Sequence, residues 1–560
     1  MPAARSGRRW CSATGPGARR HGPPARRRPD RSPTRCARDR GAPVTAVFPL
    51  GNWLAAAAER ARPDAGALVA GERVAWRELD ARADAAAAGF RALGLRPGDP
   101  VCVLMRSSVA TLAVWFGLAR AGLVEVPLNP ASGRTLLRYL LEHSGAAVVV
   151  CDAEFEPAVR ACAPETVRAV VVSGVGETSG PGGPARLDLA DVLAAAPGPL
   201  PQVDPTAAAV VLYTSGTTGP PKGAVLSHRA NVNLARHTVA LMGYTADDRL
   251  YSVFPLFHSN ARYCSVMAAA EAGADLVLDR GFSASRFWDT CRAHGVTAFN
   301  YQGAMMSILH KQLPRPDDAD NPVRQAFGAP CPPEVFASFE RRFGVQLTEI
   351  YGSTEVSIVT DMPPHARRIG SAGNESANYT VAVVDERDDP VPPGTPGEIV
   401  VRPKAAGWMF DGYAGDPAAT AASWRNLWFH TGDRGLLDAD GYLFFLDRVK
   451  DTIRRRGENV SSWEVERVIA EHPSVGQVAA YGVPSELSEE EVAIAVVPAA
   501  GATVDPAALV AYCRGTLTSF AVPRYVRVLD ALPLTPSQRV EKYKLRAEGL
   551  PPDTWDREAG

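Results

Sequence analysis

Lysine is scarce in this sequence. The chain of 560 residues has 60 lysines and arginines together, and only six of them are lysines. Such a bias is typical of a GC-rich coding sequence in which arginine replaces lysine wherever the chemistry allows. The remaining lysines are therefore more suggestive of function than lysines usually are. They are Lys222, Lys311, Lys404, Lys450, Lys542 and Lys544.

Long apolar runs are also absent. The best candidate, residues 111–128, is interrupted by Arg120 and Glu125, and no run approaches the roughly 18 apolar residues that a membrane helix needs. We expect this stretch to form a core helix followed by a strand. With 46% hydrophobic and 22% charged residues, the composition is that of an ordinary globular enzyme without a membrane span.

The nine cysteines lie at irregular spacings and form no C-x-x-C pair. This arrangement argues against a disulfide framework and against a cysteine zinc site. We therefore expect reduced, scattered thiols in a cytoplasmic protein.

Positive charge is concentrated at the start of the chain. Residues 1–43 contain twelve arginines beside Asp30 and Asp39, which gives this segment a net charge of +10 and leaves −11 for the remainder. The segment is rich in Pro and Gly, lacks hydrophobic periodicity and has no apolar core for a secretory signal, so we expect it to be disordered. A transit peptide and a nucleic-acid-binding arm stay open. We favour a leader without function, as a start codon assigned too far upstream would produce, and expect no nucleic-acid partner.

The length predicts two or more domains. Short buried strands alternate with helices between residues 99 and 212, a pattern that predicts parallel sheets flanked by helices, hence an α/β fold. Asp440 and Gly441 separate two apolar runs and predict a β-hairpin. A smaller α/β unit follows, with helices beginning near Ser461 and at Pro506. We predict a large domain over residues 44–446 and a cap over residues 452–560.

Residues 213–228, YTSGTTGPPKGAVLSH, are the most informative stretch. Glycines let backbone N–H groups turn towards an anion, hydroxyls add donors, and one lysine supplies a full positive charge. We interpret the stretch as a polyphosphate-binding loop that follows a strand. It is not a Walker A loop, because Pro220 and Pro221 separate the last loop glycine from the lysine. The candidate residues are Thr214, Ser215, Gly216, Thr217, Thr218, Gly219 and Lys222.

This stretch resembles the phosphate-binding signature of the adenylate-forming superfamily, which includes acyl-CoA synthetases, luciferases and the adenylation domains of peptide synthetases. The resemblance extends from about residue 48 to the end of the chain. It implies ATP, Mg²⁺ and CoA as cofactors, with Thr217 and Glu355 as metal ligands. It also implies a small barrel-like β part in the large domain and a mobile α+β cap that rotates about a hinge over residues 447–451, with Asp447 as the pivot.

Two further motifs are assigned to the nucleotide by this resemblance. Residues 351–355, YGSTE, resemble the Y-G-x-T-E motif of the superfamily, and residues 431–433 resemble its T-G-D motif. A carboxylate suits Mg²⁺, and two adjacent carboxylate oxygens match the vicinal hydroxyls of a ribose. The implied roles are adenine stacking for Tyr351, phosphate binding for Thr354 and magnesium binding for Glu355, with Gly352 and Ser353 in the same ATP/AMP-binding motif. Asp433 and Arg448 are assigned to the ribose, and Gly328, Ala329 and Pro330 to backbone contact with adenine.

The strings PLFHSN, NYQGAMM and RRRGENVSSWEVE look most like the carnitine/crotonobetaine-CoA ligase branch. The first two imply an acyl pocket lined by His258, Asn260, Asn300, Gly303 and Ala304. The third resembles a glycine loop that lines the pantetheine tunnel, which assigns Arg456, Gly457, Glu458 and Asn459 to CoA. For Arg454 and Arg455, contact with CoA phosphates and a solvated basic turn both stay open. The predicted pocket walls mix small, aromatic and sulfur side chains, so we expect a short to medium or compact ring acid. No cage for a cationic substrate is evident, so carnitine itself is not implied.

The sequence departs from the superfamily near its C-terminus. The usual pattern places a Gly-Lys pair where this chain, in LPLTPSQRVEKYKLR, has Gln538 and Arg539. That lysine contacts the substrate carboxylate and the α-phosphate during adenylation. Arginine keeps the charge but is bulkier. Three alternatives follow: Arg539 does the work, Lys542 or Lys544 replaces it, or adenylation is impaired.

These assignments predict an AMP-forming acyl-CoA ligase, with Lys222, Glu355, Arg539 and Lys542 as its catalytic residues. The expected partners are ATP, CoA and a small carboxylic acid. An acyl-AMP ligase that loads a carrier protein fits the same residues. A pseudoenzyme that binds nucleotide without turnover is a third interpretation, and a luciferase-like oxygenase is disfavoured.

Overall fold

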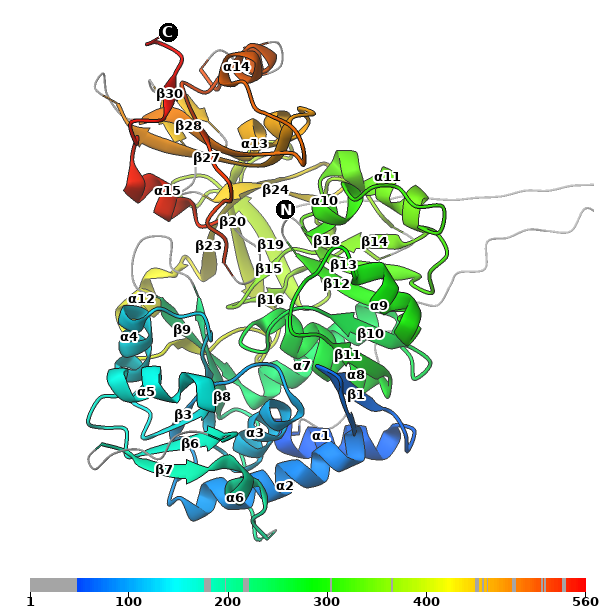
Figure 1. Ribbon diagram of the computed structural model, residues 1–560, viewed down its shortest axis with the longest axis vertical. Helices are drawn as coiled ribbons and strands as arrows, with labels where there is room; N and C mark the ends of the chain where they lie inside the picture. The colour runs from blue at the N-terminus through cyan, green and yellow to red at the C-terminus, as the bar shows by residue number, and fades with distance from the viewer. Residues whose placement is uncertain are drawn as a thin grey trace, which may run out of the picture. The chain divides into compact units, whose positions relative to one another are not determined.

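The computed structural model describes residues 48–559, apart from residues 176–182, 197, 215–220, 303–304, 364–365, 449–452, 456–457, 461, 486–489, 515–516, 518–519 and 536–539. The fold consists of two α/β layers, an antiparallel sheet and a C-terminal α+β unit (Figure 1). The α/β fold is therefore confirmed. Among the described helices, none has the length and apolarity to cross a membrane.

The first layer is an eight-stranded sheet that is mostly parallel. Alternate residues of its strands face opposite sides: Val101 and Val103 pack with the helices of one face, Cys102 and Leu104 with those of the other. Because these strands are buried on both faces, their sequences are continuous apolar runs. In sheet order the strands are β21 (Gly412–Tyr413), β9 (Lys222–Ser227), β8 (Ala208–Thr214), β4 (Val124–Pro127), β3 (Pro100–Leu104), β5 (Val148–Asp152), β6 (Ala169–Ser173) and β7 (Ala185–Asp188).

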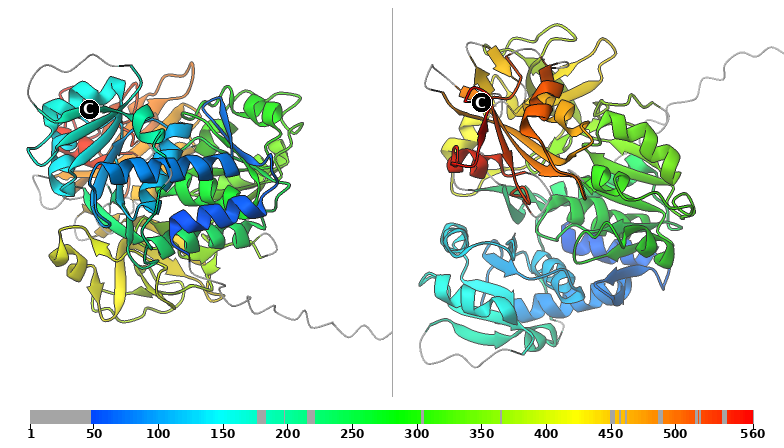
Figure 2. Two further views of the ribbon diagram at one scale, coloured as in Figure 1. Left: turned by 90° about the horizontal axis from the view of Figure 1, so that it is seen from below. Right: turned by 45° about the horizontal axis from the view of Figure 1, so that its top comes forward.

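Helices cover both faces of this sheet. On one face α2 packs against α3 and α6, and α1 lies along α2 and α3 (Figure 2). The interrupted run at residues 111–128 forms a helix and then a strand, as predicted. The helices are α1 (Leu50–Arg60), α2 (Trp76–Ala92), α3 (Val109–Arg120) and α6 (Leu189–Leu193), with α4 (Arg134–Ser144), η1 (Ala153–Phe155) and α5 (Glu156–Cys162) on the other side.

The second layer is a seven-stranded sheet, parallel except for its edge strand β2. Its strands in order are β14 (Gln346–Glu349), β13 (Gln325–Ala329), β12 (Ala298–Gln302), β10 (Arg249–Ser252), β11 (Asp275–Leu278), β1 (Gly66–Val69) and β2 (Glu72–Ala75). Its helices are α7 (His228–Met242), the π-helix η2 (Asn260–Met267), α8 (Ala268–Ala272), α9 (Phe287–His294), α10 (Met305–His310) and α11 (Pro333–Phe343).

A curled antiparallel half-barrel follows, which confirms the expected barrel-like part. The turn at Asp440 and Gly441 joins β23 to β24, as predicted, and Gly441 has the positive φ of 82° that favours glycine. The strands are β19 (Tyr379–Val384), β20 (Gly397–Pro403), β22 (Trp424–Arg425), β23 (Trp428–Leu437) and β24 (Leu443–Arg448), near α12 (Pro417–Ala422). Two short hairpins precede them, β15 (Gly352–Ser353) with β16 (Ser357–Ile358), and β17 (Thr360–Asp361) with β18 (Asn374–Glu375).

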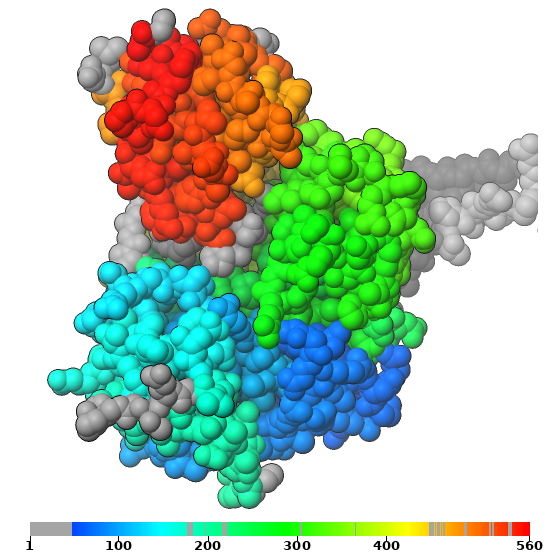
Figure 3. Space-filling model, viewed as in Figure 1, coloured from blue at the N-terminus to red at the C-terminus, as the bar shows by residue number. Residues whose placement is uncertain are grey.

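The residues after 452 bury two apolar clusters of their own. Coloured orange to red, they form one contiguous group of atoms (Figure 3). The predicted boundary near residue 446 stays a prediction. The elements are β25 (Ile453–Arg455), β26 (Glu458–Val460), α13 (Ser462–Ala470), β27 (Val475–Pro484), β28 (Glu490–Pro498), α14 (Pro506–Arg514), β29 (Tyr525–Val528), α15 (Lys542–Glu548) and β30 (Trp555–Asp556).

Arg455, in the basic segment that begins at Arg454, is buried. Arg455 is 3% exposed, and its Nε lies 2.6 Å from Oε2 of Glu491 in a buried ion pair. Its Nη1 donates to the carbonyl oxygen of Phe520 at 2.7 Å. A buried guanidinium requires such partners. The interpretation of Arg455 as a solvated residue is therefore wrong.

Candidate nucleotide and acyl site

The predicted phosphate loop joins two neighbouring antiparallel strands. Thr214 ends β8, Lys222 begins β9, and the two residues are cross-strand partners. Tyr139 and His143 of α4 contact this end of the hairpin: the hydroxyl of Tyr139 donates to the carbonyl oxygen of Pro221 at 3.1 Å, and Nδ1 of His143 lies 2.7 Å from the hydroxyl of Tyr213. The candidates Ser215, Gly216, Thr217, Thr218 and Gly219 lie outside the described residues.

The residues assigned to adenine and ribose converge. The hydroxyl of Tyr351 donates to Oδ2 of Asp433 at 2.7 Å, and both side chains are buried. The ring of Tyr351 stacks on Phe445 with 6.2 Å between centroids. Asp433 and Arg448 are cross-strand partners on β23 and β24, and Asp447 pairs with the next residue, Arg434. The backbone thus places both predicted ribose residues opposite each other at the end of β24.

Two glycines of the nucleotide motifs are required by close backbone approach. A Cβ on Gly328, in β13, would lie 1.9 Å from the carbonyl oxygen of Tyr301. A Cβ on Gly352 would lie 1.7 Å from the carbonyl oxygen of Ser357. No side chain fits at these distances, so both positions let strands approach without a gap. Ala329 and Pro330, joined by a cis peptide bond, continue from Gly328.

Glu355 lies among hydroxyl groups, between β15 and β16. Its Oε2 accepts a hydrogen bond from Ser353 at 2.8 Å, and its Oε1 accepts one from the hydroxyl of Tyr413 at 3.1 Å. The ammonium nitrogen of Lys222 lies 5.0 Å from the centroid of the Tyr413 ring. Lys222 and Glu355 are 133 positions apart in the sequence, yet both contact the side chain of Tyr413.

A magnesium ion fits this group only together with a nucleotide. Within the described part of the chain, no three His, Cys, Asp or Glu side chains gather at a position that could hold a metal. Mg²⁺ is commonly bound in proteins by one or two carboxylates together with substrate phosphates and water. Glu355 offers one such carboxylate, and phosphates and water would complete the coordination shell. Thr217, the other predicted ligand, is not among the described residues.

Two of the predicted acyl-pocket residues, Asn260 and Asn300, come from adjacent elements. Nδ2 of Asn300, on β12, donates to Oδ1 of Asn260 at 3.0 Å and to Oγ of Ser265 at 2.7 Å, which ties the strand to the π-helix η2. The ring of His258 lies 4.5 Å from that of Phe257. Gly303 and Ala304 lie outside the described residues. The structure therefore brings Asn260 and Asn300 together, beside a helix type often found at functional sites.

The cap residues are less completely described. Nζ of Lys542 lies 2.9 Å from Oε1 of Glu466 and donates to Oγ of Ser462, so it is engaged within the cap. Lys544 pairs with Glu541. Glu458 and Asn459 form β26 by backbone pairing with β25. Arg456, Gly457 and Arg539 lie outside the described residues.

A buried carboxyl group that the sequence does not indicate lies next to the adenine motif. Glu349, at the end of β14, is 5% exposed, and its Oε1 accepts a hydrogen bond from the backbone N–H of Cys331 at 2.6 Å. Burial raises the pKa of Glu349 from 4.5 to about 8, while that hydrogen bond acts in the opposite direction. The neutral carboxylic acid is therefore the form that the folded protein favours below that pH.

Glu349 should make the protein less stable as the pH rises. The folded state holds the proton up to about pH 8 and the unfolded chain releases it near pH 4.5, so between these values the unfolded chain binds fewer protons and unfolding becomes more favourable. Glu349→Gln removes this dependence and keeps an oxygen for Cys331. We expect the urea midpoint of Glu349→Gln, relative to wild type, to be higher at pH 8 than at pH 5. The exposed control Glu59→Gln should show no such difference between the two pH values. If the urea midpoints of Glu349→Gln and wild type changed with pH in parallel, the raised pKa of Glu349 would be contradicted.

Comparison with known proteins identifies the family. A model of the AMP-binding enzyme family matches residues 54–414, and a model of the AMP-binding enzyme C-terminal domain matches residues 464–539. The chain belongs to the AMP-binding enzyme family. The predicted membership of the adenylate-forming superfamily, as an acyl-CoA ligase relative, is thus confirmed.

Relatives of this AMP-binding enzyme include proteins with different named substrates. Long-chain fatty acid transport protein 5 of Homo sapiens is 33% identical over 520 residues, covering 85% of this chain and 74% of that protein. Crotonobetaine/carnitine–CoA ligase of Escherichia coli O139:H28 is 31% identical over 482 residues, covering 85% of this chain and 93% of that protein.

Solved structures share the fold of this chain. The ATP-bound structure of MatB from Rhodopseudomonas palustris is 28% identical, with a TM-score of 0.78 over 89% of this chain and 98% of that one. The anthranilate CoA ligase AuaEII in complex with anthranoyl-AMP has a TM-score of 0.81, covering 90% of this chain and 97% of that one. At 22% identity, AuaEII supports the fold alone.

Proposed function

We propose that this AMP-binding enzyme is an ATP- and Mg²⁺-dependent acid–thiol ligase that forms an acyl-CoA. A carboxylate oxygen of the substrate attacks the α-phosphorus of ATP, the bond to the β-phosphate oxygen breaks, and pyrophosphate leaves. The sulfur of CoA then attacks the acyl carbon of the adenylate. The bond from that carbon to the AMP oxygen breaks, AMP leaves, and the thiol proton passes to solvent.

The convergence of distant motifs carries this proposal. The nucleoside residues Tyr351 and Asp433 are hydrogen-bonded, and the same YGSTE turn leads within four residues to Glu355, which Tyr413 links to Lys222. In our proposal, the YGSTE segment lies along the nucleotide from its adenine end to its phosphate end. Lys222 neutralises phosphate charge as pyrophosphate departs, and Asp433 orients the ribose. Mg²⁺ bound with ATP at Glu355 supplies further charge neutralisation.

Catalysis of this kind needs no covalent enzyme intermediate. The chain holds acid and nucleotide together, and the fixed positions of the charges lower the barrier without reorganisation of solvent. In our proposal the acid lies beside His258, Asn260 and Asn300. After adenylation the cap rotates about Asp447, so that the glycine loop at residues 456–459 can admit the thiol.

A hydroxylamine-trapping screen tests the proposal directly. The protein would be incubated with ATP, Mg²⁺, hydroxylamine and a panel of short aliphatic, medium aliphatic and compact ring acids. We expect a hydroxamate, AMP and pyrophosphate with at least one acid, and a thioester when CoA replaces hydroxylamine. Formation of ADP, or a lack of affinity for ATP, would overturn the proposal. A holo carrier protein in place of CoA tests the alternative acceptor.

Arg539 should be the cap cation used in adenylation. Lys542 is already paired with Glu466 and Ser462, which favours Arg539 over Lys542 for this role. We expect Arg539→Ala to slow acid-dependent ATP–pyrophosphate exchange by about 100-fold, as loss of one charge-stabilising donor commonly does. Arg539→Lys should retain most activity, and Lys542→Ala should change the rate less than Arg539→Ala. Unchanged exchange in Arg539→Ala would exclude this residue.

A further inference from the structure

Tyr413 lies at the meeting point of the first sheet and the half-barrel. Its strand β21 pairs with β9, where Tyr413 is opposite Ala224, and the backbone N–H of Ala414 donates to the carbonyl oxygen of Gly223 at 2.8 Å. This register places the Tyr413 ring beside Lys222, the first residue of β9. The distance of 5.0 Å from Nζ to the ring centroid is within the range of a cation–π contact.

The hydroxyl of the same tyrosine contacts the predicted magnesium ligand. It donates to Oε1 of Glu355 at 3.1 Å, while Ser353 donates to Oε2 at 2.8 Å. Each oxygen of the carboxylate is thus held by one hydroxyl group. An ionised carboxylate has about four acceptor positions, so these two hydrogen bonds orient it and leave positions for a cation.

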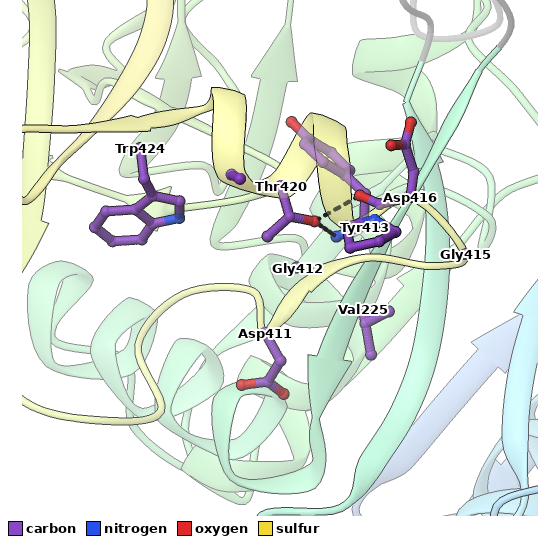
Figure 4. Close-up of a pocket in the computed structure, with 10 residues that line it drawn as sticks. Val225, Asp411, Gly412, Tyr413, Gly415, Asp416, Thr420 and Trp424 are labelled. Carbon is purple, nitrogen blue, oxygen red and sulfur yellow. Dashed lines mark hydrogen bonds between the residues drawn. The ribbon is translucent and has the colours of Figure 1, made fainter.

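Tyr413 is itself held on several sides. Its backbone N–H donates to Oγ1 of Thr420 at 2.8 Å, and Thr420 donates to the carbonyl oxygen of Asp416 at 2.9 Å (Figure 4). The ring of Phe410 packs edge-on at 4.9 Å, and the backbone N–H of Phe410 donates to the carbonyl oxygen of Glu355 at 2.8 Å. The segment from Phe410 to Tyr413 therefore contacts both the backbone and the side chain of Glu355.

We propose that Tyr413 is a positioning residue that couples the two ends of the phosphate site: its hydroxyl orients Glu355 towards the magnesium of Mg·ATP, and its ring positions the ammonium of Lys222. This rests on the proposed function. A partner that orients a metal ligand typically contributes 10- to 100-fold to metal affinity or activity. Neither local sequence nor spacing indicates the role, because Tyr413 follows Glu355 by 58 positions.

Calorimetric titration with ATP, with and without Mg²⁺, tests this role without relying on turnover. We expect wild type to bind ATP more tightly with Mg²⁺ than in EDTA. Tyr413→Phe removes only the hydroxyl, so about tenfold of the magnesium-dependent gain should be lost while binding in EDTA stays unchanged. Tyr413→Leu also removes the ring beneath Lys222, so it should weaken ATP binding in EDTA as well.

Tyr442→Phe is the matched control, because its hydroxyl donates at 3.3 Å to the carbonyl oxygen of Ala366, outside the proposed site. It should bind ATP like wild type under both conditions. Retention of the full magnesium dependence in Tyr413→Phe would overturn the role of the hydroxyl. Equal binding of the Leu and Phe variants in EDTA would overturn the role of the ring. If wild type binds no ATP at all, the proposed function fails and the role of Tyr413 fails with it.

Discussion

Glu355→Gln should lower the rate of acid-dependent pyrophosphate release by about 100-fold or more. The substitution preserves size and an oxygen atom but removes the charge that the hydroxyls of Ser353 and Tyr413 orient. Loss of several kcal/mol of charge stabilisation at a metal corresponds to this factor, since each 1.36 kcal/mol is about tenfold. The measurement is ATP–pyrophosphate exchange with an acid found in the trapping screen, at saturating ATP and Mg²⁺.

A second glutamate separates a local effect from a general loss of charge. Glu375→Gln removes a carboxylate that pairs with Lys404 at 2.7 Å, away from the proposed site, and should exchange pyrophosphate at the wild-type rate. The urea midpoint of Glu355→Gln should also stay near that of wild type. An exchange rate within a few-fold of wild type in Glu355→Gln would contradict the assignment of this residue to magnesium.

Arg262→Met should lower the free energy of unfolding by about 3–5 kcal/mol, the usual cost of leaving one member of a buried ion pair alone. Arg262 is 0% exposed and Glu125 is 2% exposed. Nη1 of Arg262 donates to Oε1 of Glu125 at 3.2 Å and to the carbonyl oxygen of Leu256 at 3.1 Å, and the guanidinium lies 3.8 Å from the Trp115 ring centroid. Urea unfolding followed by tryptophan fluorescence measures the effect.

A double variant and an exposed pair give the controls. Glu125→Leu combined with Arg262→Met leaves no unpaired charge, so the double variant should be more stable than Arg262→Met alone. Arg82→Met, which breaks the exposed contacts of Arg82 with Glu72 and Glu78, should cost less than about 1 kcal/mol. Equal losses from Arg262→Met and Arg82→Met would show that burial of the pair does not matter.

The sequence predicts the parts of the site that lie in continuous motifs. Tyr351 and Asp433 each stand in a short recognisable string, and the structure joins them by a hydrogen bond. Strands and helices were predictable for the same reason, because hydrophobic periodicity and turn residues are local. The β23–β24 hairpin at Gly441 is an example.

Long-range partners were not predictable. In the sequence Glu125 serves only to interrupt an apolar run, yet in the fold it is the partner of Arg262, 137 positions away. Arg455 looks like part of a basic surface turn because its neighbours are arginines, but it is buried and paired with Glu491. Tyr413 likewise acquires its contacts only when β21 joins the edge of the first sheet. Tertiary pairing decides each case, and no local pattern encodes it.

The hairpin between β8 and β9 has a consequence for how this chain can attract polyphosphate. In P-loop proteins the glycine-rich loop leads into a helix, whose aligned peptide dipoles place a partial positive charge at the anion. Here the segment after residue 220 continues as strand β9, and strands have only small net dipoles. In the proposed function, the attraction therefore depends on the full side-chain charge of Lys222. This need for a side-chain charge gives a physical reason for the lysine at position 222, in a chain with only six lysines.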